Sequence, residues 1–194
     1  MLAWIAVVIG VILLDQISKY LTILYLKPVD TVVLIQDILR LNYEENTGMA
    51  FSMFDQPDER WVFMSISTVA LTLLAVYMFA PRPRQLADRI PRPRSWMTWL
   101  SLSFILGGGI GNMIDRFALE YVVDMIDFYC INFAVFNVAD SFVCIGAGIL
   151  MLSMILDTVK EVRAEKARAT ESAESAESAE TAETAEACED DVNE

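Results

Sequence analysis

The sequence predicts an all-α membrane protein with four transmembrane helices and a small β-sheet cradle on the outer face. The chain has 194 residues, and 55% of them are hydrophobic, more than is usual for a soluble domain of this size. Four apolar stretches approach the length of about 20 residues that a helix needs to cross a bilayer core. Between the first two stretches, apolar and polar residues alternate with the period of a strand.

The predicted spans cover residues 2–26, 61–80, 96–114 and 136–156, within a membrane domain over residues 1–160. The first span contains Asp15 and Lys19 and could be mistaken for a signal peptide. However, no basic residue precedes Lys19, and no small-residue cleavage site follows the apolar run. We therefore expect the first span to stay attached as a helix.

The basic residues predict which way the spans point, since lysine and arginine accumulate on the cytoplasmic side. The link 81–95 has five arginines, and four basic residues follow the fourth span. The link 27–60 has three bases against seven acids. Both termini and the link 81–95 are therefore predicted to be cytoplasmic, and the links 27–60 and 115–135 to lie outside.

The first outer link is expected to contain strands rather than plain loop. Apolar and polar residues alternate over 39–44, and residues 31–35 are a β-branched run that could pair with them. We expect these two segments to form a small sheet that rests on the outer membrane surface.

The chain ends in a low-complexity segment, residues 161–194, that we expect to be a disordered cytoplasmic tail. Residues 169–194 repeat a three-residue acidic unit with ten acids and no base, so this segment accounts for most of the net charge of −13. Without it, 14 basic residues face 17 acidic ones, and the membrane domain is nearly neutral. The segment has no aromatic residue and cannot form a core of its own.

The absence of histidine narrows the possible chemistry. It excludes a Ser-His-Asp or Cys-His nucleophile and a zinc ion held by histidine. The three cysteines lie in three different regions, without the spacing of a metal site or a disulfide framework. For a membrane hydrolase, what remains is a pair of carboxylates that act as acid and base on one water molecule.

Asp124 and Asp140 are the candidates for such a pair. Asp140 lies about 6 Å inside the outer end of the fourth span, given a helical rise of about 1.5 Å per residue. Asp124 follows shortly after the third span, so both carboxylates can lie at one depth near the outer interface. Held close, they would titrate as a coupled pair that shares one proton. Two alternatives stay open: Asp127 could be the partner instead, and Asp140 could be only a helix cap.

Other polar residues lie in or beside the predicted spans. Asp15 and Lys19 are one helical turn apart and can neutralise each other. A glycine-rich run over 107–111 allows close helix packing, and Asn112 and Arg116 follow it on one face of the helix. Arg116 could either pair with Asp115 or help to hold a substrate.

With these residues in view, the chain resembles bacterial lipoprotein signal peptidase, or signal peptidase II, over roughly residues 1–157. Five motifs occur in the order of that family. They are Asp15-Gln16-Ile17-Ser18-Lys19, Asn46-Thr47-Gly48-Met49-Ala50-Phe51, the run from Gly107 to Arg116, Val122-Val123-Asp124, and Phe136-Asn137-Val138-Ala139-Asp140-Ser141.

The resemblance implies an aspartic endopeptidase of the bacterial inner membrane, with its active site near the outer face. It would cut the signal peptide from prolipoproteins just before a cysteine that carries diacylglycerol, with Asp124 and Asp140 as the catalytic pair. Residues that bind substrate or support the site would be Asn46, Gly48, Asn112, Arg116, Asn137, Asp15, Lys19 and Asp115.

The resemblance implies no metal and no organic cofactor, and prolipoproteins and membrane lipids as partners, without nucleic acid. A monomer is expected. One departure is Glu120, where many relatives have glycine, and it questions the local turn. The alternatives to a peptidase are a small transporter subunit, although no internal repeat relates the spans, and a structural membrane scaffold.

Overall fold

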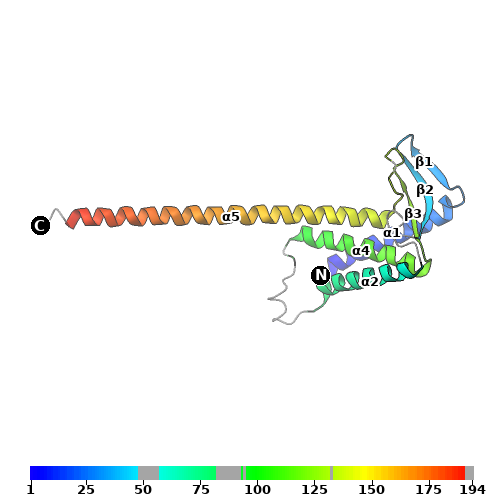
Figure 1. Cartoon of the computed structure of the whole chain (residues 1–194), viewed down its shortest axis with the longest axis horizontal. Helices are drawn as coiled ribbons and strands as arrows, with labels where there is room; N and C mark the ends of the chain where they lie inside the picture. The colour runs from blue at the N-terminus through cyan, green and yellow to red at the C-terminus, as the bar shows by residue number, and fades with distance from the viewer. Residues whose placement is uncertain (48–56, 82–92, 94, 132, 191–194) are drawn as a thin grey trace. The chain divides into compact units, whose positions relative to one another are not determined.

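The computed structural model describes residues 1–47, 57–81, 93, 95–131 and 133–190. The chain divides into two compact units, Met1–Met151 and Leu152–Glu194. The helices and strands, in order, are α1 (Leu2–Leu21), the π-helical turn η1 (Thr22–Leu26), β1 (Thr31–Ile35), β2 (Leu39–Asn46), α2 (Pro57–Phe79), α4 (Trp96–Ala118), β3 (Val122–Asp127) and α5 (Val138–Asp190) (Figure 1).

Among the described residues, four helices are long and apolar enough to cross a membrane, which confirms the predicted class. They cover Leu2–Leu26, Trp61–Phe79, Trp96–Ala118 and Val138–Lys166. The third helix continues four residues beyond the predicted end at 114, and the first charged residue there, Asp115, is buried and paired with Lys19. The fourth begins at Val138 rather than 136, because Asn137 caps it.

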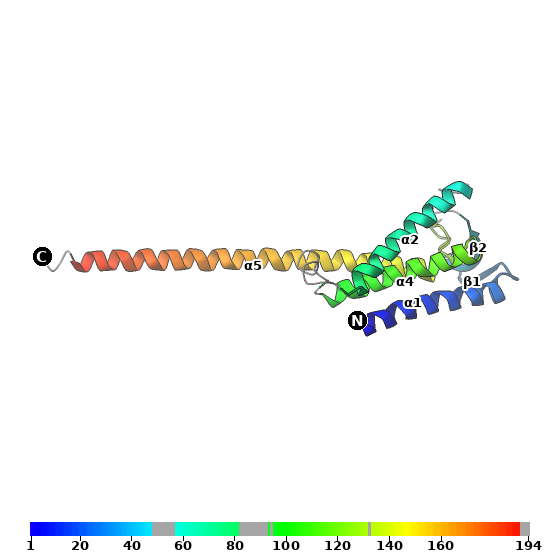
Figure 2. The same cartoon turned by 90° about the horizontal axis from the view of Figure 1, so that it is seen from below.

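Helix α4 lies between α1 and α2 (Figure 2). Val8, Leu106 and Met78, one from each helix, form the buried core of this packing. Glycines bring the backbones together: a Cβ on Gly107 would touch Val11 at 2.8 Å, and one on Gly108 would lie 2.5 Å from the carbonyl oxygen of Ala139 in α5. The small residues of α4 therefore let α1 and α5 approach it on two different sides.

The sheet, over the described residues, has three antiparallel strands in the order β1-β2-β3. The predicted pairing of residues 31–35 with 39–44 is confirmed, with Thr31 opposite Asn42. The third strand, β3, was not predicted: the link 115–135 was treated as a connection only. Leu26, Val123 and Met125 form a second buried cluster, which joins β3 to the end of the first span.

The structure differs from the prediction of a disordered tail. Helix α5 continues through Asp190 and so includes most of the segment 161–194. Between Val159 and Asp190 the sequence has no glycine or proline and is rich in alanine and glutamate, which have high helix propensity. The prediction weighed the charge and the lack of core residues, and it neglected this local preference.

Candidate active site

Asp124 lies in the middle of β3, with its side chain almost wholly buried. Both carboxylate oxygens accept a hydrogen bond from an asparagine. Asn137 Nδ2 donates to Oδ1 at 2.6 Å, and Asn46 Nδ2, at the end of β2, donates to Oδ2 at 2.9 Å. The pairing of β2 with β3 shifts register between Leu41 and Glu44, and bulges of this kind often redirect a side chain.

Asp140 lies in the first turn of α5 and is not the residue that caps it. The cap is Asn137, whose Oδ1 accepts from the Asp140 backbone N–H at 2.9 Å. The Asp140 side chain returns the bond, because its Oδ2 accepts from the Asn137 backbone N–H at 3.3 Å. This reciprocal pair is a capping box, which satisfies two of the free amides at a helix start. Oδ1 of Asp140 accepts from Asn112 Nδ2 at 2.7 Å.

One buried side chain, Asn137, connects the two aspartates. It donates to Asp124 from its amide nitrogen, and it binds Asp140 through its side-chain oxygen and its backbone amide. Strand β3 and helix α5 are therefore held together at the point where each presents a carboxylate. The structure thus brings together Asp124 and Asp140, the pair that the sequence predicted to lie at one depth.

The rival aspartate, Asp127, is bound elsewhere. It lies three positions after Asp124, with two residues between them, so the two side chains point to opposite faces of β3. Arg40, directly opposite on β2, binds Asp127 with Nε at 2.6 Å from Oδ2. The rivalry between the two aspartates could have been resolved from the sequence only if β3 had been recognised as a strand.

The predicted pair of Asp15 and Lys19 is confirmed, and it has a third member. Lys19 Nζ lies 2.9 Å from Asp15 Oδ2 and 2.9 Å from Asp115 Oδ2, and all three side chains are buried. Gln16, whose role the sequence did not predict, donates to Asp115 Oδ1 at 2.9 Å and to the Gly111 carbonyl at 3.2 Å. Its position next to Asp15 in the first motif was the feature of the sequence that could have indicated this role.

Arg116 does not form the ion pair with Asp115 that was one of its two predicted roles. Asp115 binds Lys19 instead, while the Arg116 guanidinium lies 5.2 Å above the ring of Phe63. Arg116 donates weakly to the Asn112 carbonyl at 3.4 Å, and it interacts electrostatically with Asp140 and Asp124. Its positive charge therefore lies near the two carboxylates.

The surroundings of Asp124 make it a weak acid. Burial is the main cause that raises the pKa of Asp124 from its ordinary value of 3.8 to about 7. The negative charge of Asp140 acts in the same direction, while the hydrogen bonds from Asn46 and Asn137 oppose it. A carboxyl group with this pKa exists in both protonation states near neutral pH, so it can either accept or donate a proton.

The turn before β3 contains Glu120, at the position where many relatives have glycine. Glu120 has a φ of 70°, in the left-handed region that favours glycine, two residues before β3. The turn is therefore formed with glutamate in the position where glycine would be less strained. Gly48, a predicted site residue in the Asn46–Phe51 motif, lies outside the described residues.

The sequence is similar to known proteins of one family. The family model described as signal peptidase (SPase) II matches residues 7–156. The chain is 38% identical over 150 residues to a lipoprotein signal peptidase of Brevibacillus brevis, covering 77% of this chain and 93% of the relative. It is 40% identical over 151 residues to one of Caldanaerobacter subterraneus, covering 78% of this chain and 94% of the relative.

The fold also matches solved structures. A bacterial membrane enzyme solved by the in meso method at 2.3 Å resolution superimposes with a TM-score of 0.67 at 24% identity, over 81% of this chain and 90% of that one. A second bacterial membrane enzyme, solved at 1.9 Å, superimposes with a TM-score of 0.63 over 79% of this chain. These likenesses confirm the four-helix fold with its small sheet.

Proposed function

The chain belongs to the signal peptidase II family and is a membrane-embedded aspartic peptidase with lipoprotein signal peptidase function, and on that premise we propose that Asp124 and Asp140 are its catalytic pair. The observation that carries the proposal is the single buried asparagine, Asn137, which donates to the Asp124 carboxylate from its side chain and to the Asp140 carboxylate from its backbone N–H. The family assignment leaves no support for a transporter subunit or a scaffold.

In the proposed reaction, the pair carries one proton between its two carboxyl groups. The ionised carboxylate takes a proton from water as the water oxygen attacks the carbonyl carbon of the scissile peptide bond. The protonated carboxyl then gives its proton to the leaving amine, and the bond between carbon and nitrogen breaks. The pKa of about 7 at Asp124 supports this assignment, because one shared proton then persists near neutral pH.

The polar residues around the pair would divide into two roles. Asn46, Asn112 and Asn137 donate to the carboxylates, and this supports a role in holding them in place. Arg116 makes its contacts to a backbone carbonyl and an aromatic ring, so its charge is available to bind the backbone of a substrate near both aspartates.

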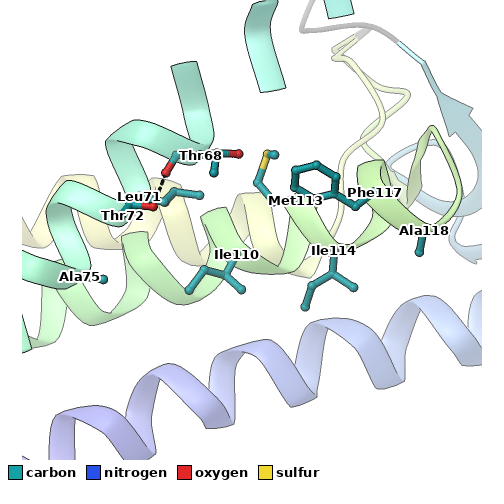
Figure 3. A pocket seen from close by; sticks show the side chains of 9 residues that line it. All are labelled: Thr68, Leu71, Thr72, Ala75, Ile110, Met113, Ile114, Phe117 and Ala118. Atoms are coloured by element: carbon teal, nitrogen blue, oxygen red, sulfur yellow. Dashed lines mark hydrogen bonds between the residues drawn. The ribbon is translucent and has the colours of Figure 1, made fainter. Parts of the chain in front are cut away.

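The proposed substrates are diacylglyceryl-modified prolipoproteins, cut on the N-terminal side of the lipidated cysteine. An apolar pocket of about 560 Å³ between α2 and α4 supports a place for an acyl chain (Figure 3). Its lining includes Ile110, Ile114 and Phe117 of α4 and Leu71 of α2, and it continues to Ala118 at the end of α4. This end of α4 also carries Arg116, so lipid and peptide could be bound by neighbouring faces of one helix.

We also propose the orientation of the chain in the bacterial inner membrane. Both termini would be cytoplasmic, and the pair would lie near the outer face, because the arginine-rich link 81–95 favours the cytoplasm. A reporter fused at residue 85 should give a cytoplasmic signal, and an external signal would overturn this orientation. The chain would act as a monomer, and the bonds that join Asp124, Asn137 and Asp140 within one copy support this.

The test is cleavage of a diacylglyceryl-modified prolipoprotein by the purified full chain in detergent, followed by gel shift. Asp124→Asn and Asp140→Asn should each abolish cleavage while the protein remains folded. Asp127→Asn is the matched control, because this aspartate lies on the same strand but binds Arg40, and it should retain cleavage. Cleavage by a folded Asp124→Asn or Asp140→Asn variant would refute the proposed pair.

A further inference from the structure

Three charged side chains form a buried triad: Lys19 with Asp15 on α1, and Asp115 on α4. At least 96% of each of these side chains is shielded from solvent. Apolar residues of similar volume would often stabilise such helix packing as well or better, because the desolvation free energy of buried charges often outweighs their mutual attraction. The triad therefore calls for a function that apolar side chains cannot perform.

Both carboxylates of this triad bind backbone amides at equivalent places. Asp15 Oδ1 accepts from the backbone N–H of Ala139 at 2.9 Å, and Ala139 directly precedes Asp140. Asp115 Oδ2 accepts from the backbone N–H of Val123 at 3.2 Å, and Val123 directly precedes Asp124. Each carboxylate of the triad thus holds the main chain one residue before one member of the catalytic pair.

Lys19 itself acts on the pair by a third route. Its Nζ donates to Asn112 Oδ1 at 2.9 Å, and Asn137 Nδ2 donates to the same oxygen at 3.1 Å. With its oxygen bound by two donors, the Asn112 amide must present its nitrogen to Asp140, to which it donates at 2.7 Å. If the Asn112 amide were flipped, its NH2 group would face the two donors, Lys19 Nζ and Asn137 Nδ2. Its oxygen would then face the Asp140 carboxylate, and both contacts would be repulsive.

We propose that Lys19 is a positioning residue for the catalytic pair: through Asp15, Asp115 and Asn112 it sets the separation, orientation and charge of Asp124 and Asp140. This inference rests on the proposed function, since it assumes that the two aspartates act together. One ammonium group is bound to three acceptors. Asn112 donates directly to Asp140, whereas Asp15 and Asp115 each bind the backbone one residue before a member of the pair. Lys19 does not touch the substrate in this scheme.

The charge of Lys19 should affect the pH dependence of cleavage, which a purely packing role would not. A positive charge near the pair favours its ionised form, so removal of that charge should move the pH dependence of cleavage upward. The other charged groups that face Asp124 come from the remaining elements packed around it. They are Asp140 of α5, Arg116 of α4, and Glu44, its cross-strand partner on β2. Asp115 of α4 binds the backbone of the preceding residue, Val123.

The test compares Lys19→Met, Lys19→Arg and the control Lys27→Met in the full chain, with kcat and KM for a lipidated prolipoprotein measured across pH 5–9. For Lys19→Met we expect kcat to fall about 100-fold, as for a misplaced catalytic group, with KM unchanged within about threefold. The pH optimum should rise by about half a unit or more. Lys19→Arg should restore the wild-type pH optimum, and Lys27→Met should match the wild type throughout.

Asp15→Asn and Asp115→Asn keep the side-chain shape and carry the test should Lys19→Met not fold. Each should lower kcat, but removal of a negative charge should leave the pH optimum unchanged or move it downward, opposite to Lys19→Met. An unmoved pH optimum in folded Lys19→Met, or an upward shift in both asparagine variants, would overturn the inference. Activity in Asp124→Asn in the same assay would instead refute the catalytic pair itself.

Discussion

Two lysines, eight residues apart in the chain, make ion pairs of nearly the same length in opposite surroundings. Lys19 lies 2.9 Å from Asp15, and both side chains are at most 3% exposed. Lys27 lies 2.8 Å from Glu45, and 48% and 41% of these side chains are exposed. The distances are alike, but the exposed pair remains hydrated and screened by salt, whereas the buried one has lost water on every side.

The comparison shows that the geometry of an ion pair does not determine its importance. The hydrogen bond to Glu45 raises the pKa of Lys27 and lowers that of Glu45, so the exposed pair is charged across the neutral range and has little further effect. The buried pair is connected to Asp115, Asn112 and the backbone beside the proposed catalytic aspartates. A substitution in the buried pair should therefore alter the geometry of the proposed catalytic site, and a substitution in the exposed pair should not.

The largest expected effect on stability comes from adding a methyl group next to the buried pair while leaving both of its residues in place. A Cβ on Gly111 would lie 2.5 Å from Asp15 Oδ2, which is held by Lys19 and cannot move freely. Gly111→Ala should lower the free energy of unfolding by roughly 2–4 kcal/mol, the range for overpacking and a disrupted buried network. Thermal unfolding in detergent measures this effect.

Gly10→Ala provides the matched control for this prediction. It lies in α1, and a Cβ there has no neighbour within 4 Å. The added methyl group should be neutral or slightly stabilising, because alanine favours a helix more than glycine does. Equal losses in the two variants would show that the Asp15 contact is not the cause.

The next effect concerns the pH dependence of stability at Asp124. Its pKa in the folded protein, about 7, lies above the ordinary 3.8, so its contribution to stability is complete below about pH 4 and is lost as the pH rises through 7. Asp124→Asn does not titrate. The variant should therefore gain stability relative to the wild type between pH 4 and pH 8, by at most about 4 kcal/mol, the full value of a shift of this size. Unfolding temperatures of both proteins across this range provide the measurement, and a constant difference would contradict it.

A smaller effect is expected at the turn before β3. Glu120 has a φ of 70°, where a side chain costs about 1 kcal/mol relative to glycine. Glu120→Gly should therefore raise the unfolding temperature slightly and leave cleavage unchanged. Glu120→Ala is the control, since alanine keeps the Cβ that causes the strain; a gain as large in Glu120→Ala would attribute the effect to the lost charge.

The smallest effect belongs to the exposed pair itself. Lys27→Met removes the ion pair with Glu45 from the surface of the sheet, where water replaces it readily. We expect no measurable change in unfolding temperature at 150 mM salt. A shift as large as that of Gly111→Ala would break the distinction between the two pairs.

Much of the site could be predicted from residue type and order. Asp124 and Asp140 were expected at one depth from their positions in the chain, and the family resemblance implied that Asn46, Asn112 and Asn137 belong to the same site. The structure brings these five side chains into one hydrogen-bonded network. Two points were not predicted. The strand β3 is mostly apolar with two aspartates, so its period was not apparent, and the neutral Gln16 carried no charge to draw attention to it.

The sequence by itself determined the four spans, the first two strands and the identity of the two candidate aspartates. These depend on local properties: the length of an apolar run, the alternation within a strand, and the rarity of a charge in a membrane segment. Only the tertiary structure decided that Asp127 binds Arg40, that Asn137 caps α5, and that Asp15 and Asp115 hold the backbone beside Asp140 and Asp124. The Arg40–Asp127 and Asp15–Ala139 bonds join residues 87 and 124 positions apart. Such bonds depend on how the helices and strands pack, which no local pattern contains.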